Sequence, residues 1–287
     1  MKLTISAAKT DSALTISGVT LTKTNLNLIK NGDFSNLKGE NILTGGWTAY
    51  SDYPAAFGNT VEIRQSAVAG NYLYMTEAPG GTAGRSANAR QAVSLYRDTV
   101  YRLSFLYKDM GNAPEPVICL YTGGTNGHII TDWPAGENRS DGWRAYTLYI
   151  RPTEDTACTL WLGSMDATGA YAYDEVYMAP CTEEDGVFFL TRQASAVKGA
   201  GCADILQKTT SLDGVERIYA AYVTDKADYK LFLASYESYD GNKTLSDIEI
   251  ARNTPLAAVN VPRGGSVRAY LWQWQNLWPL RVAVELQ

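Results

Sequence analysis

The stretch Thr99-Val100-Tyr101-Arg102-Leu103-Ser104-Phe105-Leu106-Tyr107-Lys108 decides the fold class, because large apolar side chains recur at every second position. Four of them share one face: Tyr101, Leu103, Phe105 and Tyr107. Successive side chains of a β-strand point to opposite sides of the sheet, so this period of two predicts a half-buried strand. No segment shows the sustained spacing of three and four that an amphipathic helix requires.

The same alternation recurs on both sides of this strand. We expect further strands over residues 60–65, 72–75, 91–96, 116–121, 143–151, 156–162 and 170–178. Turn-forming residues separate them, such as the run Thr122-Gly123-Gly124-Thr125-Asn126-Gly127. About eight strands at this spacing predict a jelly-roll β-sandwich over residues 25–180.

A second domain is expected after Ala179-Pro180-Cys181-Thr182-Glu183-Glu184-Asp185-Gly186, since proline, an acidic run and glycine resist both strand and helix. Strands are again predicted over residues 217–224, 230–239, 246–250, 256–261, 266–272 and 280–286. That many strands in about a hundred residues fit a smaller Ig-like sandwich over residues 186–287. The predicted fold is therefore all-β, with a jelly roll followed by an Ig-like domain.

Residues 1–24 form a separate N-terminal piece, in which two short alternating runs flank Gly18. We expect a hairpin or an extended arm. An isolated hairpin is marginally stable in water, so this arm is expected to dock on its own domain or on a partner. The first residues lack the apolar run of a secretory leader, and no run of about 18 apolar residues predicts a transmembrane helix.

Charge and composition exclude several functional classes. The chain has 25 basic and 30 acidic side chains, a net charge of −5, so it lacks the basic surface of a nucleic-acid-binding protein. Its single histidine, His128, is too little for most histidine-based catalysis and zinc sites. The four cysteines form no Cys-x-x-Cys pair, and two interpretations stay open: buried and loop thiols, or a disulfide between Cys119 and Cys158.

Several motifs, in order along the chain, resemble a known family of domains. They are Asn27-Leu28-Ile29-Lys30-Asn31-Gly32-Asp33-Phe34-Ser35, Gly45-Gly46-Trp47-Thr48, Tyr101-Arg102-Leu103-Ser104-Phe105, Gly142-Trp143 with Tyr146-Thr147-Leu148, and Tyr171-Ala172-Tyr173-Asp174-Glu175-Val176-Tyr177. Over residues 26–179 the chain resembles the carbohydrate-binding modules found beside bacterial cellulases and xylanases, and similar domains occur in phage tail and fibre proteins. The resemblance implies a jelly roll and the binding of polysaccharide.

The same resemblance implies one structural calcium ion between the first strand and the closing strand. Asp174 matches the closing motif, whereas Ser35 stands where an acidic residue commonly follows the phenylalanine. Asp33 and Asp174 are the expected metal ligands, and Glu175 is a further source of oxygen, because calcium binds carboxylates. The alternative is that Asp33 is a turn residue and Asp174 a hydrogen-bonded carboxylate at a strand end.

The C-terminal run also resembles a known domain. It reads Ser266-Val267-Arg268-Ala269-Tyr270-Leu271-Trp272-Gln273-Trp274-Gln275-Asn276-Leu277-Trp278-Pro279-Leu280. Similar endings close a small sandwich domain in Gram-positive surface proteins and glycanases, together with a Tyr-Asp-Gly turn such as Tyr239-Asp240-Gly241. The resemblance implies a modular envelope protein and no particular chemistry.

Sugar recognition requires flat aromatic faces that cover C–H groups and polar side chains that bond to hydroxyls. The 19 Tyr and 7 Trp, against 6 Phe, favour such a surface. The predicted site consists of the aromatic residues Trp133, Tyr50, Tyr53, Tyr72, Tyr74 and Tyr121, with Arg85, Arg90, Gln91 and Asn126 as polar partners. Trp133 leads this set because its proline- and glycine-containing loop offers no obvious core to fill. The alternative for each aromatic residue is ordinary packing on a strand surface.

We expect no enzymatic activity. A glycosidase needs two carboxylates about 5–10 Å apart across the scissile bond. Asp174 and Glu175 are neighbours on one strand and face opposite ways. Asp247 and Glu249 share a strand face at about 7 Å, where we expect solvated charges.

Together these features predict a non-catalytic carbohydrate-binding protein displayed on a phage virion or a bacterial surface, and hence an extracellular location. Weak sites gain strength from several copies, so a homo-oligomer is compatible with this function. Residues 1–24 are the expected contact with capsid or tail proteins, since a virion protein needs no leader. Two alternatives are a structural decoration protein that binds no sugar and an accessory module of a secreted glycoside hydrolase. Neither nucleic acid nor insertion into a membrane is expected.

Overall fold

The structure, a computed structural model, describes residues 27–35, 45–51, 60–66, 70–77, 87–97, 99–113, 115–123, 126–130, 133–163, 169–181, 186–193, 195–199, 201–223, 229–251, 256–276, 279 and 283–287. Most of these residues lie in antiparallel strands; they include one 3-10 turn at Ser140–Gly142 and no α-helix. The all-β prediction is confirmed. In the described part of the chain no helix is long and apolar enough to cross a membrane. The expected arm, residues 1–24, lies outside the described residues.

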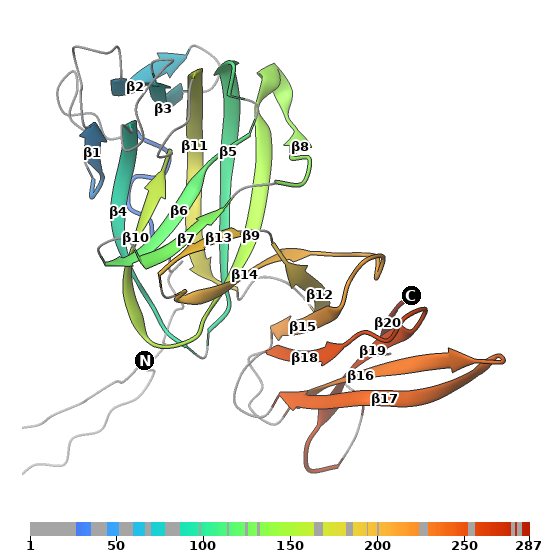
Figure 1. Cartoon of the computed structure of the whole chain (residues 1–287). Helices are drawn as coiled ribbons and strands as arrows, with labels where there is room; N and C mark the ends of the chain where they lie inside the picture. Colours follow the sequence, from blue (N-terminus) through green and yellow to red (C-terminus); the bar gives the residue numbers. More distant parts are fainter. Residues whose placement is uncertain are drawn as a thin grey trace, which may run out of the picture.

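One sheet has six strands (Figure 1). In spatial order they are β1 (Thr48–Ser51), β4 (Ala87–Leu95), β10 (Thr156–Leu162), β6 (Ile118–Gly123), β7 (Asn126–Ile130) and β13 (Ser195–Lys198). Neighbours in this sheet come from distant parts of the sequence, as in a jelly roll.

A second sheet has ten strands. Nine follow one another in space as β18 (Leu256–Asn260), β15 (Arg217–Val223), β12 (Gly186–Arg192), β14 (Ala203–Lys208), β9 (Arg144–Pro152), β5 (Tyr101–Gly111), β11 (Gly169–Pro180), β3 (Gly70–Glu77) and β2 (Thr60–Ser66), while the short β8 (Glu137–Asn138) pairs with β9.

A third sheet, of four strands, lies at the C-terminal end of the molecule (Figure 1). Its order is β17 (Asn242–Ala251), β16 (Tyr229–Tyr239), β19 (Ser266–Gln273) and β20 (Val284–Leu286).

The main core joins side chains of the six-stranded sheet to those of the ten-stranded sheet. The β5 side chains that the period of two turns inward are all at most 2% exposed: Tyr101, Leu103, Phe105 and Tyr107. Leu160 and Leu162 of β10 meet them from the other sheet. Full burial of one such side chain contributes about 1.5–3 kcal/mol, so the alternation found in the sequence is also the main source of stability. A separate core, with Ile218 and Leu233 among its members, lies under the four-stranded sheet.

Residues 195–208 join the first sandwich, although the sequence analysis assigns them to the second domain. β13 pairs with β7 at one edge of the six-stranded sheet, and β14 pairs with β9 in the ten-stranded sheet. β12 then pairs with both β14 and β15. The ten-stranded sheet therefore runs without interruption past the boundary expected at residues 181–185.

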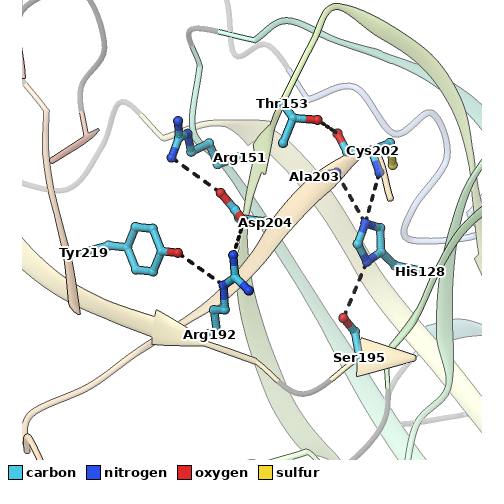
Figure 2. Close-up of polar contacts among 9 residues, drawn as sticks. All are labelled: His128, Arg151, Thr153, Arg192, Ser195, Cys202, Ala203, Asp204 and Tyr219. Atoms are coloured by element: carbon cyan, nitrogen blue, oxygen red, sulfur yellow. Dashed lines mark hydrogen bonds and ion pairs between the residues drawn. The ribbon is translucent and has the colours of Figure 1, made fainter. Parts of the chain in front are cut away.

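His128 on β7 fixes this segment in place (Figure 2). Its Nε2 atom accepts hydrogen bonds from the backbone N–H groups of Cys202 (3.2 Å) and Ala203 (3.3 Å). Its Nδ1 atom lies 3.5 Å from the hydroxyl of Ser195. Burial lowers the pKa of His128, which favours the neutral imidazole whose Nε2 can accept. The single histidine of the chain thus has a structural role.

Asp204 on β14 adds ionic contacts at the same junction (Figure 2). Its carboxylate lies 3.4 Å from Arg151 on β9 and 3.2 Å from Arg192 on β12. Arg192 also donates a hydrogen bond to the hydroxyl of Tyr219 at 3.2 Å. Partly exposed ion pairs contribute only about 0–1 kcal/mol each, so these contacts orient the strands more than they stabilise them.

Among the described residues no disulfide forms, and Cys119 and Cys158 both remain thiols. Cys158 lies in the main core, and its burial raises the pKa of the thiol to about 12. The structure therefore supports the interpretation of buried and loop thiols over a disulfide between Cys119 and Cys158.

Candidate functional site

Four side chains from three neighbouring strands gather on the outer side of the six-stranded sheet. Alternation places them there, because the residues next to them along each strand point into the main core, as Ala89, Leu120 and Leu160 do. The four side chains, here called the Trp161 cluster, are Asn88 and Arg90 of β4, Tyr121 of β6 and Trp161 of β10.

Register brings these side chains into contact. Trp161 pairs with Arg90 across the β10–β4 ladder, and the guanidinium carbon lies 3.6 Å from the centre of the indole ring. The ring of Tyr121 lies 4.4 Å from that of Trp161, tilted by 50°. Arg90 also donates a hydrogen bond from Nε to the side-chain oxygen of Asn88 at 2.5 Å. Guanidinium–indole contact is worth about 0.5–2 kcal/mol, so the arginine helps to hold the ring in one orientation.

Within the Trp161 cluster Arg90 is the single charged side chain, and Asn88 and Tyr121 are neutral. Burial, with a smaller contribution from Cys119, raises the pKa of Tyr121 well above its usual value, so its hydroxyl stays protonated. Asn88 and Tyr121 are almost fully buried, whereas Trp161 and Arg90 are partly exposed. The arrangement therefore presents a partly exposed indole and guanidinium, which a buried amide and a buried phenol support from beneath.

Of the predicted site residues, Arg90 and Tyr121 are therefore brought together. Tyr50 lies on β1 opposite Asn88 in register, but its side chain is outside the described residues, as are Tyr53 and Arg85 altogether. Sequence reasoning missed Trp161. The sequence does contain a signal for Trp161, because it is the large aromatic residue on the outward face of a strand whose other face is apolar.

Gln91 points the other way, toward the core, and is 5% exposed. Its amide oxygen accepts from the backbone N–H of Lys30 at 2.7 Å, and its amide nitrogen donates to the Lys30 carbonyl at 3.0 Å. These two hydrogen bonds connect residues 27–35 to β4. Because Gln91 and Arg90 are adjacent on β4, they face opposite sides of the sheet and cannot belong to one binding surface.

Tyr72 and Tyr74 lie on β3 in the other sheet, away from the Trp161 cluster. Tyr74 lies beneath the guanidinium of Arg64 at 3.3 Å, and Tyr72 packs edge-on against Trp143 at 5.8 Å. Asn126 is exposed at the start of β7. The predicted residues therefore do not form a single surface.

The reason given for choosing Trp133 is wrong. Its ring does have a core to fill: it is 7% exposed and packs edge-on against Phe105 and Tyr146, each at 5.4 Å between ring centres. The loop folds back over β5 and β9, which the residues of the loop alone did not reveal. A groove of about 450 Å³ lies beside this ring and is bounded by Arg102 and Glu175 among others.

The two expected metal ligands differ in their surroundings. Asp174 is 4% exposed, and its carboxylate accepts from the backbone N–H of Glu175 at 2.7 Å. Burial, opposed by that hydrogen bond and aided by Glu175 and Asp33, raises the pKa of Asp174 to about 7. Asp33 is exposed and bonds to the N–H and hydroxyl of Ser35 at 3.3 and 3.0 Å.

Calcium requires six to eight oxygen ligands. Asp33 and Asp174 could supply carboxylate oxygens, but the described residues contain no group of three or more acidic, histidine or cysteine side chains suited to a metal ion. Backbone carbonyls would therefore have to supply much of the shell.

Asp247 is partly exposed and Glu249 is exposed, in line with the expectation of solvated charges, and both also have a structural role. Their carboxylates accept hydrogen bonds from the backbone N–H groups of Asn260 (3.2 Å) and Ala258 (3.3 Å). Both donors belong to β18, at the edge of the ten-stranded sheet. The carboxylates of Asp247 and Glu249 therefore act as hydrogen-bond acceptors along the β18 edge of the ten-stranded sheet.

The fold and the Trp161 cluster together define an all-β sandwich protein with aromatic and polar side chains gathered on an outer sheet face. No protein-family model and no curated protein sequence matches the chain. Its fold is similar to that of carbohydrate-binding modules, of a protein described as a putative sugar binding protein and of a phage tailspike domain.

Three solved structures illustrate this likeness. The enzymatically active domain of tailspike protein 4 from Bacteriophage CBA120 is 16% identical over 54% of this chain and 21% of that chain, with a TM-score of 0.37. A putative sugar binding protein from Bacteroides thetaiotaomicron VPI-5482 is 15% identical over 54% of this chain and 99% of that chain, with a TM-score of 0.38. The tandem CBM22-1–CBM22-2 domain of Xyn10C from Paenibacillus barcinonensis is 16% identical over 87% of this chain and 90% of that chain, with a TM-score of 0.36. At these identities the likeness concerns the fold alone.

Proposed function

We propose that the protein binds polysaccharide, without catalysis, at the Trp161 cluster. The observation that carries the proposal is the contact between Arg90, Trp161 and Tyr121 on the outer side of a sheet. The partly exposed indole of Trp161 would cover the apolar face of a sugar, and the guanidinium of Arg90 would bond to its hydroxyls, while the buried Asn88 and Tyr121 hold these two side chains in place. One such site binds weakly, and several copies on one particle would strengthen attachment to a polymer.

Replacing Trp161 with alanine tests this proposal. The variant should lose retention on the recognised polysaccharide, because the stacking surface disappears and Arg90 loses the ring that orients it. Affinity electrophoresis against a panel of bacterial-surface and plant polysaccharides measures retention, with at least a tenfold weakening expected.

Tyr96→Ala is the matched control, since Tyr96 is an aromatic residue 61% exposed outside the Trp161 cluster. It should bind as the unchanged protein does. Saturable binding that survives Trp161→Ala would remove the cluster from the site. No binding to any polysaccharide would favour the structural decoration protein instead.

The context that we propose is the surface of a phage virion or of a bacterium, and the alternative is an accessory module of a secreted glycoside hydrolase. The proposal rests on the motif resemblance and on the two short alternating runs of residues 1–24, a pattern suited to docking. Deleting residues 1–24 should prevent incorporation into particles, as measured by immunoblotting of purified virions, and leave the thermal unfolding of the rest unchanged. Normal incorporation would contradict the role of the arm.

We also propose a structural calcium ion at Asp174 and Asp33. The support is the proximity of a buried and an exposed carboxylate, whose mutual repulsion a cation would relieve.

A further inference from the structure

The strands of the six-stranded sheet contain no acidic residue. The chain has 30 acidic side chains among its 287 residues, and strands of the other two sheets carry several of them, such as Glu62, Asp204 and Glu249. The six strands hold two charged residues, Arg90 on β4 and Lys198 on the edge strand β13, and both are cationic. The charge within these strands is therefore positive, in a protein whose net charge is −5.

Arg90 is the charged group of the Trp161 cluster, and two contacts hold it in place. Its guanidinium carbon lies 3.6 Å from the centre of the Trp161 ring, and its Nε donates to the side-chain oxygen of Asn88 at 2.5 Å. A ligand that approaches Trp161 therefore meets the guanidinium together with the ring. The planar fork of a guanidinium matches the paired oxygens of a carboxylate or a phosphate, and a fork that is already oriented loses little further freedom on binding.

The side chains next to Arg90 on the outer side of the sheet are neutral. Register places Thr48 of β1 on one side of Arg90 and Trp161 of β10 on the other. Asn88 and Tyr121 complete the Trp161 cluster. At physiological salt, charges more than about 8–10 Å apart are largely screened, so the carboxylates of the other two sheets oppose an anion at Arg90 only weakly.

We propose that the Trp161 cluster binds an anionic polysaccharide, with a carboxylate or phosphate group of the polymer on Arg90. This inference rests on the proposed function, because it names the class of glycan that the same site takes. The exposed part of the Trp161 ring contacts C–H groups of the sugar, and Arg90 pairs with the anionic group. A neutral polysaccharide fits less well, because a hydroxyl forms a weaker hydrogen bond with arginine than an anionic oxygen does.

Two polymers with the same backbone test the proposal. Polygalacturonate carries a carboxylate on each sugar, and its methyl-esterified form does not. The unchanged protein should bind the acidic form at least about tenfold more tightly. Biolayer interferometry on immobilised polymer measures both affinities, with a chelator present so that calcium does not cross-link the acidic form. Raising NaCl from about 0.05 to 0.5 M should weaken binding to the acidic form alone.

Alginate and wall teichoic acid distinguish the two kinds of anionic group. Alginate is a second polymer that carries carboxylates, whereas wall teichoic acid carries phosphates. The tighter of the two identifies the group that Arg90 recognises. Equal or weaker binding of all three acidic polymers, compared with the esterified one, would overturn the inference.

Arg90→Gln removes the charge and keeps N–H donors at the same place. It should weaken binding to the preferred acidic polymer at least about tenfold and change binding to the esterified polymer little. Arg90→Lys keeps the charge without the planar fork and should retain part of the preference. Arg64→Gln is the matched control, since Arg64 also lies over a ring, that of Tyr74 at 3.3 Å, but on the ten-stranded sheet. It should bind as the unchanged protein does, and thermal unfolding checks that each variant is folded.

The results separate this inference from the proposed function. Equal affinity for the acidic and the esterified polymer, lost in Trp161→Ala, would overturn the inference and leave the proposed function in place. A preference for acidic polymers that survives in folded Arg90→Gln would place the recognition of charge elsewhere and would also overturn the inference. No binding to any polymer would contradict both.

Discussion

Burial shifts the protonation of two single residues in this protein. It favours the uncharged form of both His128 and Asp174, lowering the pKa of the first and raising that of the second to about 7. For His128 the neutral ring is useful, because it accepts two backbone hydrogen bonds. For Asp174 ionisation at neutral pH is a cost that a bound cation would offset.

Asp174→Asn should stabilise the metal-free protein at pH 8. The folded-state pKa of Asp174 is raised, so its contribution to stability is complete below about pH 4 and lost as the pH rises through 7. The variant avoids this loss, and its free energy of unfolding should exceed that of the unchanged protein by on the order of 2–4 kcal/mol at pH 8, with little difference at pH 4. Urea unfolding with a chelator at both pH values measures this.

Calcium should reverse the order at pH 8 if the ion binds at Asp174, raising the unfolding temperature of the unchanged protein but not that of Asp174→Asn. An equal response of both proteins would place calcium elsewhere or exclude it. A stability difference that does not change with pH would contradict the raised pKa.

At the scale of elements, β17 and β18 show how side chains can complete a sheet. β18 ends the ten-stranded sheet, and carboxylates of β17 accept from its backbone N–H groups in place of another strand. The inward-facing carboxylates of Asp247 and Glu249 thus serve the neighbouring strand, while Ile248 between them faces outward and is 52% exposed.

Asp247→Ala and Glu249→Ala should each lower the free energy of unfolding by about 1–2 kcal/mol, because a backbone donor loses its acceptor. Thermal unfolding followed by circular dichroism measures the loss. Glu237→Ala on the exposed end of β16 is the control and should change stability by less than about 0.5 kcal/mol. Similar small effects for all three variants would show that water replaces the carboxylates without cost.

At the scale of the whole molecule, residues 195–208 make the two sandwiches one continuous structure. β13 and β14 extend both sheets of the first sandwich, and β12 carries the larger sheet onward. His128 and Asp204 bond across this junction. The first sandwich is therefore incomplete without residues that follow the expected boundary.

A fragment of residues 25–180 should therefore be much less stable than a fragment of residues 25–210. The shorter one lacks β13 and β14, exposes the edges of β7 and β9, and leaves Nε2 of His128 without Cys202 and Ala203. Thermal unfolding of the two fragments compares them directly. Equal unfolding temperatures would mean that the boundary at residues 181–185 separates independent units.

The sequence by itself determined the all-β fold and the inward face of its clearest strands, because a period of two depends only on neighbouring residues, as in β5. It also supplied Arg90 and Tyr121, which the structure brings together in the Trp161 cluster. Only the tertiary structure decided that Arg90 faces Trp161, that Trp133 turns into the core and that β13 and β14 complete the first sandwich. These outcomes depend on register and on contacts between residues far apart in the chain, which local alternation does not encode.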